Sequence, residues 1–135
     1  MYTQSTDIRV RYSETDQMGY VYYGNYAQYY EVGRVEALRA LGVRYREMEE
    51  SGVMMPVLEM KTKYIRPAKY DDLLTIKTTI KELPTTRISF HIEIHNGDQL
   101  INIGEVTLVF VDMKTGRPVQ APQWIIDKLS ASISE

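Results

Sequence analysis

The chain has 135 residues, of which 44% are hydrophobic and 25% are charged, and its formal net charge is −2 at pH 7. This length suits one domain, which we expect over residues 1–135, and the near balance of charges argues against nucleic-acid binding, which needs a basic excess. The absence of cysteine excludes a disulfide framework, a thiolate zinc site and a cysteine nucleophile.

The first half of the chain predicts a strand followed by one long helix. Residues 7–12 alternate, with Val10 and Tyr12 on the inward side. The period then changes to three and four residues from Asn25 to Leu41, which predicts a helix. Gly42 is suited to the position just after its last turn.

The second half of the chain predicts mostly antiparallel strands. Four segments are extended or alternating, and the pair Asn96-Gly97 predicts a tight hairpin turn between two of them. The predicted elements are strands over residues 54–65, 73–81, 86–95 and 100–112, a turn over 113–118, a short helix over 122–129 and a polar tail over 130–135. One long helix laid on a meandering sheet is an α+β layout that buries the apolar faces of both.

No apolar run in the chain is long enough to span a bilayer, and the first ten residues lack a signal-peptide pattern. We therefore expect no membrane span and a cytoplasmic protein. The chain also lacks the motifs of a dinucleotide site, a phosphate-binding glycine loop and a serine nucleophile elbow. We predict that it uses no cofactor.

The two histidines lie in the segment HIEIH, where His91, Glu93 and His95 share one face of a predicted strand. Two imidazoles and a carboxylate are a known zinc ligand set. However, residues two apart on a strand are nearly 7 Å apart, so the histidines are separated by more than about 13 Å. We predict a polar outer face and no metal site.

Asp16 is the candidate catalytic residue. An isolated aspartate in a segment such as ETDQMG commonly forms a turn by bonding nearby backbone amides. Asp16 also lies just before a helix start, where free N–H groups and the helix dipole favour developing negative charge. A carboxylate beside such donors suits acyl transfer, in which the acid attacks a carbonyl or deprotonates water and the amides hold the oxyanion.

Tyrosines surround this acid and divide into two groups by position. The rings within the predicted helix have the spacing of core residues, whereas those before the helix are placed to line a groove. The first group is Tyr26, Tyr29 and Tyr30, and the second is Tyr20, Tyr22 and Tyr23. Within the helix, Glu31 and Arg34 are one turn apart, which fits a surface pair, and we favour the alternative of a buried pair.

Two longer segments resemble a known family. The segment RYSETDQMGYVYYGNYAQYYEVGRVEAL, residues 11–38, resembles the signature of the 4-hydroxybenzoyl-CoA thioesterase family of hotdog-fold acyl-CoA hydrolases. The segment YIRPAKYDDLLTIKT, residues 64–78, resembles the second block of these proteins. The positions in register are Thr15, Asp16, Gly19, Val21, Tyr22, Tyr23, Asn25, Tyr26, Glu31 and Arg34.

The resemblance implies a hotdog fold, in which a five-stranded antiparallel sheet wraps a long central helix. It also implies dimers or tetramers with active sites at the interface between two subunits. Carried over by position, Asp16 is the catalytic carboxylate and the backbone N–H of Tyr23 polarises the thioester carbonyl. The short-chain branch of the family often has histidine where this chain has Tyr23, and an aromatic residue resembles the aroyl-CoA type. Acyl-CoA and aroyl-CoA substrates both stay open.

The remaining site predictions concern substrate binding. The motif and the position before the helix indicate Gly19, Tyr20, Tyr22 and Asn25. The phosphates of coenzyme A call for basic residues, and Arg66, Lys69 and Arg87 lie near predicted strand ends. Direct attack by Asp16 and activation of water stay open. Two other functions also stay open, namely a thioesterase for acyl carrier protein and a hotdog protein that binds an acyl thioester without cleaving it.

Overall fold

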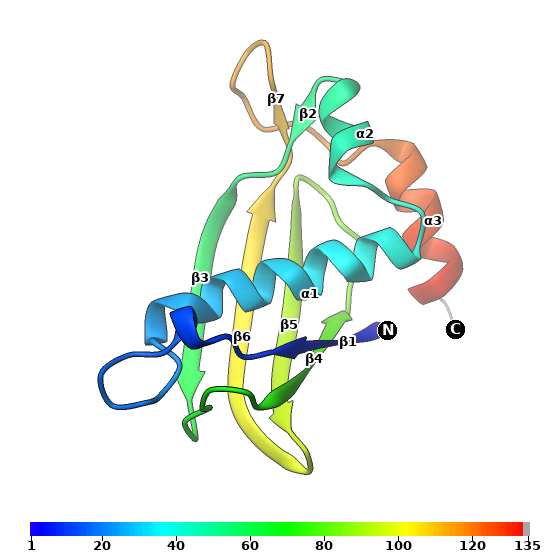
Figure 1. The fold of residues 1–135 in the computed structure, drawn as a ribbon. Coiled ribbons are helices and arrows are strands. Elements are labelled where there is room, and N and C mark those ends of the chain that lie inside the picture. The colour runs from blue at the N-terminus through cyan, green and yellow to red at the C-terminus, as the bar shows by residue number, and fades with distance from the viewer. Residues whose placement is uncertain (134–135) are drawn as a thin grey trace.

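One long helix packs across a sheet of five antiparallel strands in the computed structural model, which describes residues 1–133 (Figure 1). The strands are β1 (Tyr2–Arg9), β3 (Val57–Tyr64), β4 (Leu73–Ile80), β5 (Arg87–Asn96) and β6 (Gln99–Val109). Their order in the sheet is β1-β4-β5-β6-β3, so β1 and β3 are the two edges. The predicted α+β layout is confirmed.

The long helix is α1 (Tyr26–Ala40), which crosses one face of the sheet (Figure 1). It matches the predicted helix within a residue at each end. Gly42 follows it with φ +82°, the left-handed conformation that ends a helix at low cost in glycine. The smaller elements are η1 (Tyr12–Glu14), η2 (Tyr23–Asn25), α2 (Tyr45–Glu50), β2 (Val53–Met54), β7 (Val111–Asp112) and α3 (Gln123–Ile133).

The helix and the sheet approach each other closely because glycines stand at the contacts. A Cβ atom built on Gly33 of α1 would lie 2.6 Å from both Ile76 Cγ2 and Thr78 Oγ1 of β4. A Cβ on Gly104 of β6 would lie 2.3 Å from Cζ of the buried Tyr30 ring. Larger side chains at these two positions would push α1 away from the sheet.

Strand alternation places the core as the sequence predicted. The inward residues of β5 are buried and the residues between them face outward, where they are partly or fully exposed. The buried set on this strand is Ile88, Phe90, Ile92 and Ile94. The three tyrosines of α1 assigned to the core, Tyr26, Tyr29 and Tyr30, are also buried, as predicted.

Several sequence predictions need correction. The first strand runs over Tyr2–Arg9 rather than residues 7–12, and Tyr12 is 78% exposed in η1 rather than facing inward. The chain turns away from the sheet after Val10, so the alternation does not continue to Tyr12. The short helix α2 was not predicted. The last helix α3 extends to Ile133 and includes most of the predicted polar tail, whose residues 134–135 lie outside the described part.

The predicted buried pair between Glu31 and Arg34 is wrong. Arg34 is buried, but Glu31 is exposed, and no ion pair joins them among residues 1–133. The hydroxyl of Tyr45 in α2 lies near Arg34. Burial raises the pKa of Tyr45, and the neighbouring Arg34 guanidinium offsets this only in part. Within residues 1–133, no helix is both long enough and apolar enough to cross a membrane.

Candidate active site

The loop that carries Asp16 folds back on the segment leading into α1. The Asp16 amide donates to the Tyr20 carbonyl (2.8 Å), and the Tyr22 amide donates to the Glu14 carbonyl (2.9 Å). Gly19 makes the turn with φ +82°, a conformation that other residues rarely adopt. Backbone hydrogen bonds at Asp16 and at Glu14 therefore hold the Asp16 loop against the segment that leads into α1.

The Asp16 carboxylate makes the hydrogen bonds of a turn-forming aspartate. Its Oδ1 accepts from the amides of Met18 (2.9 Å) and Tyr20 (3.2 Å). Its Oδ2 accepts no hydrogen bond from the described residues. The turn role that the sequence left open is present, and one carboxylate oxygen is still available for chemistry.

Asp16 also lines an open groove with a volume of about 640 Å³. Gly19 forms part of its wall, and two exposed tyrosines, Tyr12 and Tyr70, form another part. Their rings meet edge to face with centroids 5.8 Å apart. The sequence reading missed Tyr12 and Tyr70 as groove residues because nothing local to either residue indicates that they meet.

Tyr23 starts the turn of helix η2, which leads directly into α1. The first amides of a helix have no intrahelical acceptor, so this is where free N–H donors are expected. The Tyr23 carbonyl is used differently, since it accepts from the Tyr64 hydroxyl (3.3 Å). The Tyr23 side chain is exposed and packs on Tyr22, with ring centroids 4.6 Å apart.

Tyr23 is not among the residues that line the Asp16 groove. It follows three residues after Tyr20, whose carbonyl accepts from the Asp16 amide. The joint role of the Asp16 carboxylate and the Tyr23 amide stays a prediction.

The sequence reading missed Glu14, a buried carboxylate two residues before Asp16. It accepts hydrogen bonds from the Arg11 amide (2.8 Å), the Arg11 guanidinium (3.0 Å) and the Tyr29 hydroxyl (3.0 Å). Burial alone would raise the pKa of Glu14, but these hydrogen bonds outweigh it and hold the pKa below its usual range. Burial and this carboxylate raise the pKa of Tyr29.

The lowered pKa of Glu14 predicts that the stability of the fold depends on pH. Because its pKa is lower in the folded protein than in the unfolded chain, it stabilises the fold above the unfolded value of about 4.3. That contribution is lost as the pH falls through the folded-state pKa. We expect Glu14→Gln to flatten the loss of stability between pH 6 and pH 3, measured as urea midpoints. The surface variant Glu49→Gln serves as control, and equal slopes in wild type and Glu14→Gln would contradict the prediction.

The other predicted binding residues lie in different places. Asn25 is at the end of η2, and its Nδ2 donates to the Glu14 carbonyl (2.8 Å), which leaves its Oδ1 for a substrate. Lys69 is exposed and pairs through its backbone with Tyr20, beside the Asp16 loop. Arg66 is also exposed and follows β3. The roles of these residues stay predictions.

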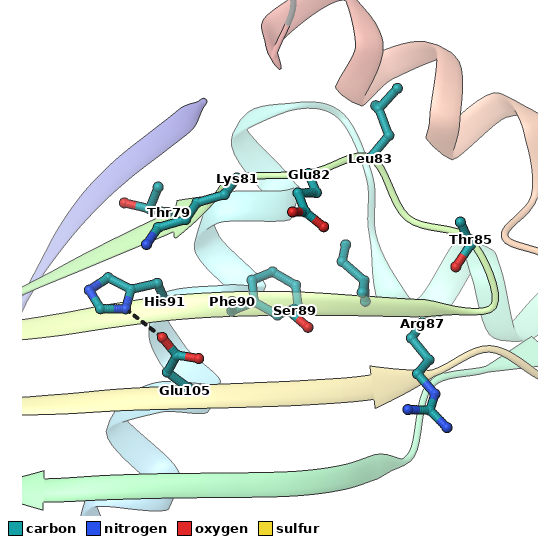
Figure 2. Close-up of a pocket in the computed structure, with 11 residues that line it drawn as sticks. Thr79, Lys81, Glu82, Leu83, Thr85, Arg87, Ser89, Phe90, His91 and Glu105 are labelled. Atoms are coloured by element: carbon teal, nitrogen blue, oxygen red, sulfur yellow. Dashed lines mark hydrogen bonds and ion pairs between the residues drawn. The ribbon is translucent and has the colours of Figure 1, made fainter.

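Arg87 lies at the other end of the sheet. It pairs with Val109, whereas Tyr64 near the Asp16 loop pairs with Asn102, and these two β6 positions are about 23 Å apart along the strand. Arg87 lines a separate groove of about 430 Å³, in which it points away from His91 and Glu105 (Figure 2). Within one chain it does not join the other predicted residues.

The histidines lie on the outer face of β5, as the alternation predicted. Glu93 lies between them, 3.0 Å from Nε2 of His95 and 3.4 Å from Nε2 of His91. His91 also contacts Glu105 of β6 through Nδ1 at 3.0 Å. In the part of the chain that the structure describes, no group of three or more such side chains is placed to hold a metal ion.

Comparison with known proteins assigns the chain to a family. The model of the thioesterase-like superfamily matches residues 10–129. The acyl-CoA thioester hydrolase YbgC of Escherichia coli is 34% identical, over 88% of this chain and 90% of that protein. The acyl-CoA thioesterase YbgC of Haemophilus influenzae is 30% identical, over 88% of each chain.

The solved structures agree with the sequence relatives. The DHNA-CoA thioesterase from Staphylococcus aureus is similar with a TM-score of 0.89 and 31% identity, covering 97% of this chain and 93% of that chain. Proteins named as thioesterases thus share both the sequence and the fold of this chain. The chain belongs to the thioesterase-like superfamily and has the hotdog fold. The predictions of family, fold and a thioester hydrolase are confirmed.

Proposed function

We propose that the protein hydrolyses an acyl-CoA or aroyl-CoA thioester to the free acid and coenzyme A, with Asp16 and the Tyr23 backbone amide acting on the thioester carbonyl. The observation that carries this assignment is the Asp16 carboxylate, which lines an open groove and keeps one oxygen available. The names of the relatives support a coenzyme A ester as substrate.

The chemistry fits a site with one carboxylate and an amide donor. Asp16 either attacks the carbonyl carbon, which expels the CoA thiolate and leaves a mixed anhydride for water to cleave, or removes a proton from the water that attacks. The amide of Tyr23 stabilises the oxygen that becomes negative in either case. A thiolate leaves readily, so a strong general acid is not needed.

The edge strand β3 supports the predicted homo-oligomer, a dimer or a tetramer. Its backbone is unpaired along one side in a single chain, and an exposed edge of this kind favours pairing with another chain. The large apolar residues exposed on or next to this strand are Val57, Leu58, Met60, Tyr64 and Ile65. We propose that two copies join their β3 strands antiparallel about a two-fold axis, which extends the sheet across both chains.

This dimer would also explain the position of Arg87. In an antiparallel pair, the Val57 end of one β3 lies beside the Tyr64 end of the other. The end of the sheet that carries the partner's Arg87 therefore comes to the same side as Asp16. A site assembled from two chains would bring Arg87 towards Lys69, which lies beside the Asp16 loop in its own chain.

A charge on β3 tests the dimer. We expect Met60→Lys to shift the protein to monomers and to reduce thioester hydrolysis at least tenfold, because two lysines would face a closely paired edge. The measurement is light scattering during size-exclusion chromatography, followed by activity at matched concentration. Met113→Lys, at an exposed methionine beyond β7, is the control. A fully active monomeric Met60→Lys would refute the shared site.

The two alternative functions separate in one assay. The same acyl group is presented on coenzyme A and on acyl carrier protein, and thiol release is followed. Faster release from coenzyme A supports the proposal, whereas faster release from the carrier protein favours the second substrate. Thermal stabilisation by the esters without thiol release would indicate a binding protein.

A further inference from the structure

Glu14 connects the Asp16 loop to helix α1 through both its backbone and its side chain. Its carbonyl accepts from the Tyr22 amide (2.9 Å) and from Nδ2 of Asn25 (2.8 Å), which are the residues on either side of Tyr23 and Gly24. Its Oε1 accepts from the hydroxyl of Tyr29, in the first turn of α1 (3.0 Å). One residue thus contacts the helix start at three points.

The Glu14 side chain also contacts Arg11, which precedes it in the chain. Its carboxylate accepts from the amide and the guanidinium of Arg11, and both residues lie only a few positions before Asp16. The Glu14 side chain is 7% exposed, while the Arg11 side chain is 73% exposed. The Glu14 carboxylate is therefore buried, and its hydrogen bond with the Tyr29 hydroxyl connects it to the protein interior.

We propose that Glu14 is a positioning residue that holds the Asp16 carboxylate in register with the first amides of the α1 segment. This inference rests on the proposed function. Asp16 follows Glu14 by two residues, and Tyr23 lies between two donors to the Glu14 carbonyl. A shift of Glu14 therefore moves the acid and the donor relative to each other, and a misplacement of about 1 Å at a reacting group costs about 10²-fold in rate.

Tyr29→Phe is the primary test because it removes one hydroxyl and leaves the ring in place. We expect kcat to fall about tenfold or more, with KM for the CoA ester within twofold of wild type, since the groove itself is unchanged. Glu14→Gln should also lower kcat: its remaining oxygen can still accept from the Arg11 amide and the Tyr29 hydroxyl, but its NH₂ would replace Oε2 and face the Arg11 guanidinium, donor against donor. Both variants are assayed as the purified full-length protein with the ester that wild type hydrolyses best.

Tyr30→Phe provides a matched control. Tyr30 is the next residue of α1, is equally buried, and donates its hydroxyl to Asn102 of the sheet rather than to the loop. We expect a comparable loss of thermal stability in Tyr29→Phe and Tyr30→Phe, but a loss of kcat only in Tyr29→Phe. Equal losses of kcat in both would indicate a general packing effect and would overturn the proposal.

A double variant separates this inference from the proposed function. If Glu14 and Tyr29 act through Asp16, then Tyr29→Phe should lower the residual rate of Asp16→Asn by less than twofold, since effects on one unit are not additive. Wild-type kcat in both Glu14→Gln and Tyr29→Phe, with Asp16→Asn inactive, rejects only the positioning role. Wild-type kcat in Asp16→Asn rejects the proposed function itself.

Discussion

Replacing Asp16 by asparagine is expected to lower the hydrolysis of CoA esters by about 10³-fold or more without unfolding the protein. The amide oxygen of asparagine can still accept from the amides of Met18 and Tyr20, which are the two hydrogen bonds that Oδ1 of Asp16 makes in the turn. It can neither attack a carbonyl nor remove a proton from water. The substitution thus keeps the turn role of Asp16 and removes its chemical role.

The measurement is thiol release from a series of acyl chain lengths and aromatic CoA esters, together with thermal unfolding. Asp98→Asn, in the turn between β5 and β6, is the control for loss of one exposed carboxylate. Asp16→Ala adds a second comparison, because it removes the turn hydrogen bonds as well and should also lower the unfolding temperature. Turnover close to wild type in Asp16→Asn would mean that Asp16 only shapes the loop.

Gly104→Ala is expected to have the largest effect on stability. Its new Cβ would lie 2.3 to 2.8 Å from three carbons of the Tyr30 ring, which is fully buried between α1 and the sheet. The ring cannot move into solvent, so the helix has to shift, and overpacking of this kind costs about 1–3 kcal/mol. We place Gly104→Ala at the upper end of that range because three contacts are affected.

The free energy of unfolding from urea denaturation measures this effect. A double-mutant cycle with Tyr30→Leu identifies its cause, because removing the ring should relieve part of the strain and make the double variant more stable than the sum of the single effects. Glu105→Ala, at the next residue of β6 but on the exposed face, should change stability by about 0.5 kcal/mol or less. Strictly additive losses would show that the Tyr30 contact is not the cause.

Elements with a long and regular pattern were predictable from the sequence. The helix at Tyr26–Ala40 and the strand at Arg87–Asn96 have clear periods, and the turn at Asn96-Gly97 has the residues that its geometry needs. The short helix at Tyr45–Glu50 has six residues and no sustained apolar stripe, so it was missed. The first strand was misplaced because Tyr2–Arg9 is half exposed and polar.

The site was predictable in part. Asp16 and Tyr23 were predicted from a local motif before a helix, and in the structure Asp16 lines an open groove. Glu14 was missed because its partner Tyr29 is 15 residues away and no local pattern connects them. The position of Arg87, at the far end of the sheet from Asp16, depends on strand order, which a list of strands does not specify.

The sequence alone thus determined most of the secondary structure, the family and the acid proposed for the chemistry, because each depends on residues close together in the chain. Only the tertiary structure decided which side chains meet. It buried Arg34 without Glu31, brought Tyr12 against Tyr70, and joined Glu14 to Tyr29. These contacts form between segments that are brought together by helix–sheet packing, and that packing reflects the burial of the whole apolar core rather than any single motif.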